Sequence, residues 1–304
     1  IRAMASLPGF DPNNYHSEKN IGVFLNPVIH KVFEPGSVAK VLTMAAAIDD
    51  KKITPESRYY DGGARIIDGY EVNNFDQKAY GEQTIMFAIE KSLNLGAIFA
   101  VEQMDKRTYK SYLQDFGLGK KTGVSLPGEL TGDISNLDQE VDINYATASF
   151  GQGISLTPLQ LATAVSAIAN NGYISKPRIF EYEGIVSDRQ VISKKTAQAV
   201  TDMMKNNVAS SYKRAQVPGF SLAAKTGTAQ IPQAGGYEED KWIHSFVGFG
   251  PAHDAKFLIL LKIEEPKGVR YAATSLSESF QRLAKFMLHY YKVRPEVPII
   301  DEDE

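Results

Sequence analysis

The sequence contains no cysteine, so disulfide bonds, thiolate metal sites and a thiol nucleophile are excluded. This absence suits an oxidising compartment as well as the cytosol, and it therefore assigns no location. No apolar run approaches the roughly 18 residues of a membrane-spanning helix, and no signal-peptide pattern opens the chain. Because the chain starts abruptly at Ile1 with an apolar stretch, we expect a fragment or a processed form without its upstream part.

A large excess of charge of one sign is also missing. The 33 basic and 36 acidic residues are spread along the chain and leave a net charge of -3, which does not indicate a surface for nucleic acid. The glycine-rich pieces at 61–63 and 151–153 match neither a P-loop nor a dinucleotide fingerprint. The five histidines lack the paired spacing of metal ligands. We therefore expect no nucleic-acid partner, no cofactor and no metal.

The length of 304 residues allows one large domain with a substantial core. Residues 1–6 resemble a first strand that ends at the turn residues Pro8 and Gly9. Residues 84–172 have apolar clusters at helical spacing, so this segment is expected to be mostly helical.

The last third of the chain has the pattern of a sheet followed by a helix. Phe220, Leu222 and Ala224 recur at a period of two, which predicts a strand. Residues 244–250 and 256–264 predict an antiparallel pair. The final helix is expected to bury one apolar face, which consists of Phe280, Leu283, Phe286, Met287 and Tyr290.

Together these elements predict an α+β fold. It has an antiparallel sheet built from both chain ends and flanked by helices, and a helical lobe inserted at about residues 50–150. Residues 1–294 are expected to form this domain. Residues 295–304, which end in four acidic residues, are expected to form a flexible tail.

Ser37 and Lys40 form the first candidate pair for chemistry. Helix-forming residues begin after Pro35-Gly36, so Ser37 and Lys40 should lie on one face of a helix, one turn apart. A serine hydroxyl becomes an effective nucleophile when a base takes its proton. A lysine can be that base if burial and nearby cations lower its pKa. We therefore predict Ser37 as nucleophile and Lys40 as general base.

This pair alone is a weak signal, because Ser210 and Lys213 have the same spacing. We interpret the second pair as solvated surface at a helix end. Ser92-Leu93-Asn94 lies between two apolar helical segments, which favours a helix-to-helix corner that faces the site. A simple helix cap is an equally good interpretation of this short motif in isolation.

Lys225-Thr226-Gly227-Thr228 continues the predicted strand after Ala224. A glycine here would let a substrate backbone approach the strand edge, and Lys225 with the threonine hydroxyls would donate to a carboxylate. A second Lys-Thr-Gly at 121–123 lies in a glycine-rich loop without a strand pattern before it, so we interpret it as a turn.

Ser-x-x-Lys, Ser-x-Asn and Lys-Thr-Gly in this order resemble the signature of penicillin-binding proteins and serine β-lactamases. The surroundings are most similar to class B penicillin-binding proteins, the monofunctional transpeptidases of division or elongation. The likeness includes Phe33-Glu34-Pro35-Gly36-Ser37 and residues 149–160, and it covers essentially the whole chain. It implies a penicillin-binding protein/serine β-lactamase-like fold.

The resemblance implies a D,D-transpeptidase. Ser37 would attack the carbonyl between two D-alanines of a peptidoglycan stem peptide, and the amine of a neighbouring stem would resolve the acyl-enzyme. Ser92 and Lys225 would relay a proton to the leaving amine. The backbone N–H groups of Ser37 and Thr228 would form the oxyanion hole.

The same resemblance implies how substrate is held. Asn94 would bind the substrate amide. Thr226, Gly227 and Thr228 would bind substrate along the strand edge, with the threonines on the terminal carboxylate. Because a β-lactam mimics this terminus, penicillins are expected to acylate Ser37 and inhibit the enzyme.

The class also implies a setting and alternatives. We expect a membrane-anchored protein at the extracytoplasmic face of the bacterial cytoplasmic membrane, whose full-length form has a membrane glycosyltransferase as partner. A serine β-lactamase is disfavoured because no glutamate occurs in the Glu-x-x-x-Asn arrangement that activates a deacylating water in class A enzymes. A β-lactam sensor domain shares the three motifs and stays a second alternative.

Overall fold

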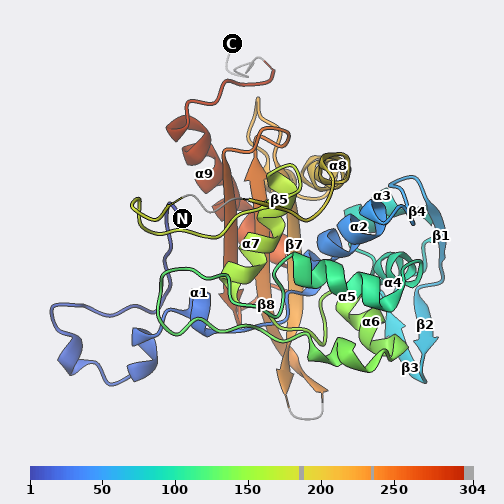
Figure 1. Cartoon of the computed structure of the whole chain (residues 1–304), viewed down its shortest axis with the longest axis horizontal. Coiled ribbons are helices and arrows are strands. Elements are labelled where there is room, and N and C mark those ends of the chain that lie inside the picture. The colour runs from blue at the N-terminus through green and yellow to red at the C-terminus, as the bar shows by residue number, and fades with distance from the viewer. Residues whose placement is uncertain (185–187, 234–235, 298–304) are drawn as a thin grey trace.

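The computed structural model describes residues 1–184, 188–233 and 236–297. Its three-stranded antiparallel sheet contains β7 (Ala223–Gln233), β8 (Gly236–Gly250) and β9 (Phe257–Glu264) in the order β7-β8-β9 (Figure 1). β8 pairs with both neighbours, and its His244 lies opposite Thr228 of β7. The predicted antiparallel pair and the strand before it are confirmed, although β7 begins only at Ala223.

The sheet is not built from both chain ends. Residues 1–6 form no strand, and their side chains are exposed except for the half-buried Met4. A run of six residues that ends before Pro8 and buries so little apolar surface has no core to hold it in an extended pairing. The prediction of a first strand is therefore wrong.

Neighbouring residues of β8 enter two separate cores. Phe246 stacks on Phe280 of α9 (Ala272–Tyr290), with ring centroids 4.6 Å apart. Val247 belongs to the main core, together with residues of α2 (Ala39–Asp49) and α7 (Pro158–Ala169). Because successive side chains of a strand alternate between faces, the sheet lies between α9 and the helices of the main core (Figure 1).

The buried stripe of α9 differs from the predicted one. It recurs every four residues and consists of Leu276, Phe280, Ala284 and Leu288. Three of the residues predicted to be buried are exposed, namely Leu283, Phe286 and Tyr290. Gly248 lies so close to Phe280 that a Cβ there would be 2.6 Å from the ring. Phe280, which the predicted and the observed stripe share, is thus the residue that packs most closely on the sheet.

The lobe after α2 combines helices with short strands. Its helices are α3 (Ile85–Lys91), α4 (Asn94–Glu102), α5 (Lys106–Asp115) and α6 (Asp142–Ser149). β1 (Arg58–Asp61) pairs with β4 (Gly81–Thr84), and β2 (Ala64–Ile67) pairs with β3 (Tyr70–Asn73). These strands are mostly exposed and polar, so the apolar periodicity of residues 50–84 did not indicate them.

The remaining elements connect these layers. They are η1 (Tyr15–Ser17), η2 (Ile21–Phe24), α1 (Pro27–His30), η3 (Gly36–Val38), η4 (Ser135–Gln139), β5 (Tyr173–Ile174), β6 (Arg189–Gln190), α8 (Lys194–Ser210) and η5 (Lys213–Ala215). In the part of the chain that the structure describes, no helix has the length and apolar character to span a bilayer.

Only the start of the predicted flexible tail lies within the described residues. Glu296 is bound there, because its backbone N–H donates to the Gly219 carbonyl at 2.7 Å and its carboxylate accepts from the Ser221 hydroxyl. Residues 298–304 lie outside the described part, so the prediction is not tested for them.

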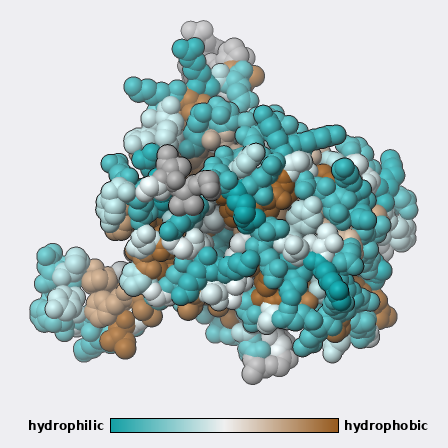
Figure 2. Space-filling view, viewed as in Figure 1, coloured by the Kyte–Doolittle hydropathy of each residue, from teal (hydrophilic) through white to brown (hydrophobic). Residues whose placement is uncertain are grey.

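The N-terminal segment with η1 and η2 leaves the body of the protein, at the lower left of Figure 1. Apolar side chains are exposed along it, and Figure 2 shows them as a brown patch: Leu7, Phe10, Ile21, Phe24 and Leu25. None of these residues belongs to a hydrophobic core of the described chain. The packing of the domain therefore does not depend on this excursion.

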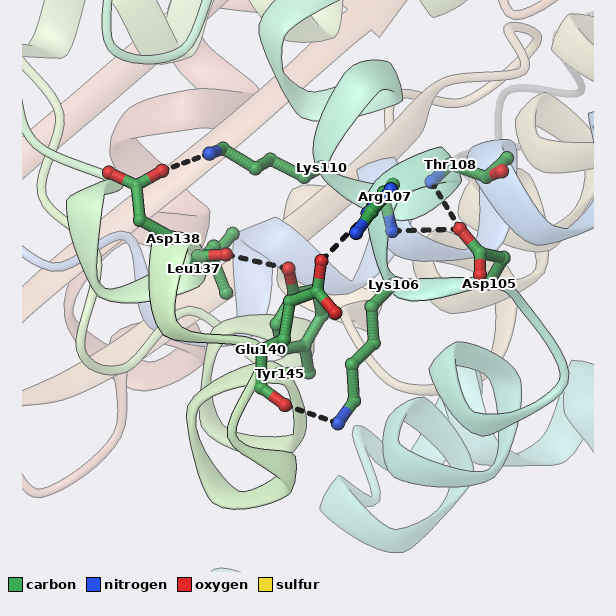
Figure 3. A network of polar contacts seen from close by, with 9 residues as sticks. All are labelled: Asp105, Lys106, Arg107, Thr108, Lys110, Leu137, Asp138, Glu140 and Tyr145. Carbon is green, nitrogen blue, oxygen red and sulfur yellow. Dashed lines mark hydrogen bonds and ion pairs between the residues drawn. The ribbon is translucent and has the colours of Figure 1, made fainter.

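A network of polar side chains joins α5 to the segment before α6 (Figure 3). Arg107 donates to Glu140 at 2.8 Å, and Lys110 is paired with Asp138. The buried Tyr145 donates its hydroxyl proton to the Leu137 carbonyl at 2.7 Å. Water screens the exposed ion pairs, so their contribution to stability is small, and we assign this network a structural role within the lobe.

The turn that carries Ser37 rests on residues 151–156. The Gly36 N–H donates to the Gly151 carbonyl at 3.1 Å, and Phe33 and Leu156 exchange two backbone hydrogen bonds. Glu34 accepts the Gly153 N–H at 2.9 Å, and burial raises the pKa of this carboxyl. Residues 149–160, which carry part of the family resemblance, therefore support the Ser37 turn through backbone contacts.

Gly151 makes this support possible. It has a φ of 85°, and a Cβ at this position would lie 2.2 Å from the Gly36 carbonyl oxygen. The chain there has both a left-handed conformation and a steric contact that only glycine satisfies.

We expect Gly151→Ala to lower the free energy of unfolding in urea by about 3 kcal/mol, since conformational strain and a steric clash add. Gly69→Ala is a matched control, because Gly69 has a φ of 83° with no atom within 4 Å of the added Cβ. It should cost about 1–2 kcal/mol from strain alone. Equal losses in the two variants would contradict a role of the close contact.

Candidate active site

Ser37 lies in the 3-10 turn η3 directly before α2, and Lys40 lies in the first turn of α2. The Ser37 side chain is half-buried, whereas Lys40 is fully buried. Lys40 Nζ is 2.9 Å from Ser37 Oγ. A spacing of three residues thus brings the hydroxyl and the amine into direct contact.

Burial determines the charge of Lys40. Removal from water holds its pKa well below the ordinary value of 10.5, and the positive charge of Lys225 lowers it further. A neutral amine has a lone pair that can accept the Ser37 proton, and an ammonium has none. The environment therefore favours the form of Lys40 that acts as a base.

Ser92 connects the two lysines. It ends α3 in a left-handed conformation with a φ of 59°, directly before α4. Lys40 Nζ is 2.5 Å from the Ser92 carbonyl oxygen and 3.4 Å from Oγ. Lys225 Nζ donates to the same Oγ at 2.7 Å. The predicted corner between helices exists, and its hydroxyl lies on a hydrogen-bonded path from Lys225 to Lys40.

Asp61 and Asn74 hold this corner, and the sequence analysis missed both. The fully buried Asp61 carboxylate accepts two hydrogen bonds from Asn74 Nδ2, at 2.8 and 3.0 Å. Asn74 Oδ1 accepts the backbone N–H of Asn94 at 2.9 Å and of Leu95 at 3.3 Å, so it caps α4. In the sequence, Asp61-Gly62-Gly63 is recognisable only as a glycine-rich piece. No known motif links Asp61 to Asn74, which lies 13 residues later.

Asn94 lies beside Ser92 with a half-buried side chain. Its Nδ2 donates to the Asn73 carbonyl at 2.7 Å, which orients the amide. Among the described residues, no group donates to Asn94 Oδ1. This oxygen is thus available to accept a hydrogen bond from a bound molecule.

Lys225 and the two threonines lie on β7, opposite Ser92. Lys225 is fully buried, and Thr226 and Thr228 are half-buried, so the threonine hydroxyls line the accessible side of the strand. Thr228 Oγ1 accepts the Ala272 N–H at 3.1 Å. Since this hydroxyl accepts from the protein, its own proton is free for a ligand.

Gly227 is needed for a different reason from the predicted one. A Cβ at this position would lie 2.4 Å from Ser245 Oγ and 2.7 Å from the Pro35 carbonyl oxygen. The missing side chain therefore makes room for the turn that carries Ser37, and the expectation that it also lets a substrate backbone approach stays a prediction.

His244 supports the strand behind Thr228. Its ring nitrogens lie 2.8 Å from Ser275 Oγ and 3.1 Å from the Arg270 carbonyl oxygen, and burial lowers its pKa. These contacts fasten the start of α9 to the sheet. Nearby, Trp242 and Arg270 line a cavity of about 480 Å³.

The second Lys-Thr-Gly lies in a turn, and Ser210 and Lys213 lie on the surface at a helix end, as predicted. Thr122 and Gly123 donate their backbone N–H groups to the Glu129 carboxylate and form a closed turn. Ser210 is exposed and donates to the Asn206 carbonyl, and Lys213 is exposed as well. Among the described residues, Ser210 makes no hydrogen bond to Lys213.

The described residues contain no group of three or more histidine, aspartate or glutamate side chains arranged to hold a metal ion. Within the same part of the chain, no carboxylate is hydrogen bonded to Ser37, Lys40 or Ser92. The polar groups around the nucleophile are therefore two lysines, a serine and an amide, which suit proton transfer and anion binding.

Asn74→Ala should lower the free energy of unfolding by about 3 kcal/mol, because it leaves the buried Asp61 carboxylate and two helix N–H groups without their partner. Asn170→Ala is the control, since Asn170 is exposed and its side chain donates only to the Tyr173 carbonyl. It should cost less than about 1 kcal/mol. Urea denaturation measures both, and similar losses would contradict the capping role.

Comparison with known proteins matches the whole arrangement to one family. The model of the penicillin binding protein transpeptidase domain matches residues 1–285. The chain is 33% identical over 310 residues to stage V sporulation protein D of Bacillus subtilis, which covers 97% of this chain and 48% of that protein. It is 29% identical over 279 residues to the peptidoglycan D,D-transpeptidase FtsI of Escherichia coli K12, with 91% and 47% covered. The chain thus spans about half the length of these curated relatives.

Solved structures of the same family have the same fold as this chain. The transpeptidase domain of penicillin-binding protein 3 from Burkholderia pseudomallei has a TM-score of 0.83 at 28% identity, over 90% of this chain and 84% of that chain. Penicillin-binding protein 3 from Mycobacterium tuberculosis complexed with ampicillin has a TM-score of 0.82 at 29% identity, over 92% and 66%. The predicted α+β fold is confirmed, and the chain belongs to the penicillin-binding protein transpeptidase domain family.

Proposed function

We propose that this domain is a serine D,D-transpeptidase that cross-links peptidoglycan stem peptides through an acyl-enzyme on Ser37. The observation that carries the proposal is the 2.9 Å contact between Ser37 Oγ and a buried Lys40 whose pKa is lowered. The relatives named peptidoglycan D,D-transpeptidase support the substrate class.

In the first step, neutral Lys40 takes the Ser37 proton while Oγ attacks the carbonyl carbon between two D-alanines. The tetrahedral oxyanion accepts hydrogen bonds from the backbone N–H groups of Ser37 and Thr228. The C–N bond then breaks, and the leaving nitrogen receives a proton through the Ser92 hydroxyl. This hydroxyl accepts a hydrogen bond from Lys225 Nζ at 2.7 Å. Free D-alanine departs, and the peptide stays attached to Ser37 as an ester.

In the second step, the amine of a neighbouring stem peptide attacks this ester carbonyl. The amine loses a proton to the Lys40 and Ser92 path, the C–O bond to Ser37 breaks, and Oγ recovers a proton. One amide bond is broken and one is formed over the two steps, so the cross-link needs no other reactant.

Binding groups surround the reacting atoms. The Thr226 and Thr228 hydroxyls and the Lys225 charge would hold the terminal carboxylate, with Asn94 Oδ1 on a substrate amide N–H. A β-lactam carries a carboxylate near its strained amide and would be attacked in the same way. The structures of Mycobacterium tuberculosis penicillin-binding protein 3 complexed with aztreonam and ampicillin support this for a relative.

The alternatives make different use of the acyl-enzyme. A β-lactamase needs a base for the deacylating water, and no carboxylate is hydrogen bonded to the catalytic groups among the described residues. A sensor would acylate but would not pass the acyl group to an amine. The names of the relatives favour transpeptidation over both.

We also propose a setting for the whole protein. Since its substrate is peptidoglycan, the domain would act at the extracytoplasmic face of the bacterial cytoplasmic membrane. The longer protein would be anchored there and would work with a membrane glycosyltransferase that supplies the glycan strands. The match to only about half of each relative is consistent with a further region that mediates such contacts.

Labelled benzylpenicillin should give one long-lived adduct, on Ser37, by mass spectrometry. Ser37→Ala should abolish the adduct, and Ser210→Ala should retain it, because Ser210 has the same motif without the contact to a buried lysine. An adduct that disappears rapidly would indicate a β-lactamase. Transfer from a thioester substrate to an added amine distinguishes an enzyme from a sensor, which would show none.

The rate of acylation by benzylpenicillin should rise with pH as Lys40 loses its proton, with the ascending limb well below pH 10.5. Lys225→Gln removes a positive charge that lowers this pKa, so the limb should move to higher pH while the maximal rate falls. The exposed Lys213→Gln should leave the limb in place. Stopped-flow mixing over a pH series measures it, and an unmoved limb in Lys225→Gln would contradict coupling of the lysines.

A further inference from the structure

Tyr212 follows α8 and contacts two of the three β7 residues that would hold the substrate carboxylate, Lys225 and Thr226. Its ring is buried against Phe246, with centroids 5.6 Å apart. Its hydroxyl lies 3.0 Å from Thr226 Oγ1 and 3.4 Å from Lys225 Nζ. Tyr212 belongs to the repeated Ser-x-x-Lys at 210–213, which has no role in the proposed reaction.

The surrounding donors settle the direction of the hydroxyl bond. Lys225 Nζ and the Thr226 N–H are both donors, so the Tyr212 oxygen accepts from each. A tyrosine hydroxyl has one proton, and its remaining neighbour is Thr226 Oγ1. Thr226 Oγ1 therefore accepts from Tyr212. Its own proton is left to point toward the accessible side of β7, where Thr226 is half-buried.

The Tyr212 hydroxyl oxygen is also a hydrogen-bond acceptor for Lys225. An ammonium has three N–H donors, and Lys225 Nζ has three acceptors: Ser92 Oγ at 2.7 Å, the Thr226 carbonyl at 3.2 Å and Tyr212 Oη at 3.4 Å. Among the described residues, Lys225 has no carboxylate partner. Its three donors are thus satisfied by neutral oxygens, and its charge, which no carboxylate neutralises, attracts an anion through space.

The chain around Tyr212 is fastened to both walls of the site. Asn207 Nδ2 donates to the Ala224 carbonyl at 3.0 Å, one residue before Lys225. Ser211 Oγ donates to the Glu90 carbonyl at 3.1 Å, near the end of α3 that leads to Ser92. Tyr212 therefore occupies a fixed place between the two walls.

We propose that Tyr212 is a positioning residue that makes the Thr226 hydroxyl a donor to the terminal carboxylate of the substrate and orients the Lys225 charge toward the same group. Tyr212 does not touch the substrate in this role. The inference rests on the proposed function, because it concerns the same carboxylate.

Tyr212→Phe removes the hydroxyl and keeps the ring on Phe246. The test compares rate constants for acylation of Ser37 by benzylpenicillin and by its methyl ester, which lacks the charged carboxylate. The preference for the free acid over the ester should fall about tenfold in Tyr212→Phe, the size expected for one charge-assisted hydrogen bond. The melting temperature should change little.

Tyr145→Phe is the matched control, because Tyr145 is also buried with a hydrogen-bonded hydroxyl but lies in the network of Figure 3. Its preference for the free acid should equal that of the wild type. An unchanged preference in Tyr212→Phe would overturn the inference and leave the proposed function intact. Equal loss of both rates with a lower melting temperature would also overturn it, in favour of a purely structural role. A wild-type protein that penicillin does not acylate at Ser37 would overturn both.

A double-mutant cycle locates the effect. Thr226→Val removes the hydroxyl that Tyr212 orients, so Tyr212→Phe should then change the preference for the free acid much less than in the wild-type background. Thr226→Ser keeps a hydroxyl and should restore the full effect of Tyr212→Phe. Independent, multiplicative effects of Tyr212→Phe and Thr226→Val would contradict action through Thr226.

Discussion

Two buried lysines share the single hydroxyl of Ser92, and this contact determines the chemistry of the site. Like charges repel strongly where little water screens them, so a second ammonium beside the first is unfavourable. Lys225 has three oxygen acceptors that satisfy a charged group. Lys40 lies next to the Ser37 proton and has a pKa lowered by burial and by Lys225. Both amines have three oxygen neighbours, so the burial of Lys40 beside the Lys225 charge, and not the number of acceptors, favours Lys40 as the base.

The scaffold around this contact depends on close backbone approach. Gly151 lies under the turn of Ser37, and Gly227 lies beside it on β7, and neither position has room for a Cβ. Asn74 holds the corner of Ser92 and Asn94 by capping α4, and the buried Asp61 fixes the orientation of the Asn74 side chain. Glycines and one buried polar pair therefore set the distances among the catalytic groups more directly than the hydrophobic core does.

Local sequence patterns predicted much of the fold and of the candidate site. The Ser37 and Lys40 spacing, the Ser92 corner and the β7 strand each depend on a few neighbouring residues. Tyr212, Asp61 and Asn74 act through contacts between distant segments, so no local pattern indicated them. The prediction of a first strand was wrong because a short apolar stretch before a turn cannot show whether a partner strand exists. The predicted α9 face was partly wrong because two apolar stripes of this helix have helical spacing and share Phe280, so the periodicity alone could not show which one packs on the sheet.

The contacts of Ser92 also have a consequence for folding. Lys40 and Ser92 are 52 positions apart, and Ser92 and Lys225 are 133 apart. Closing such long loops costs chain entropy that is recovered only when the segments pack, so these contacts form late. A partly synthesised or partly unfolded chain has the Ser37 segment but does not yet have Lys225 and the threonines placed beside it. The reactive serine is thus assembled only in the complete domain, which limits premature acylation of a chain that has not yet folded.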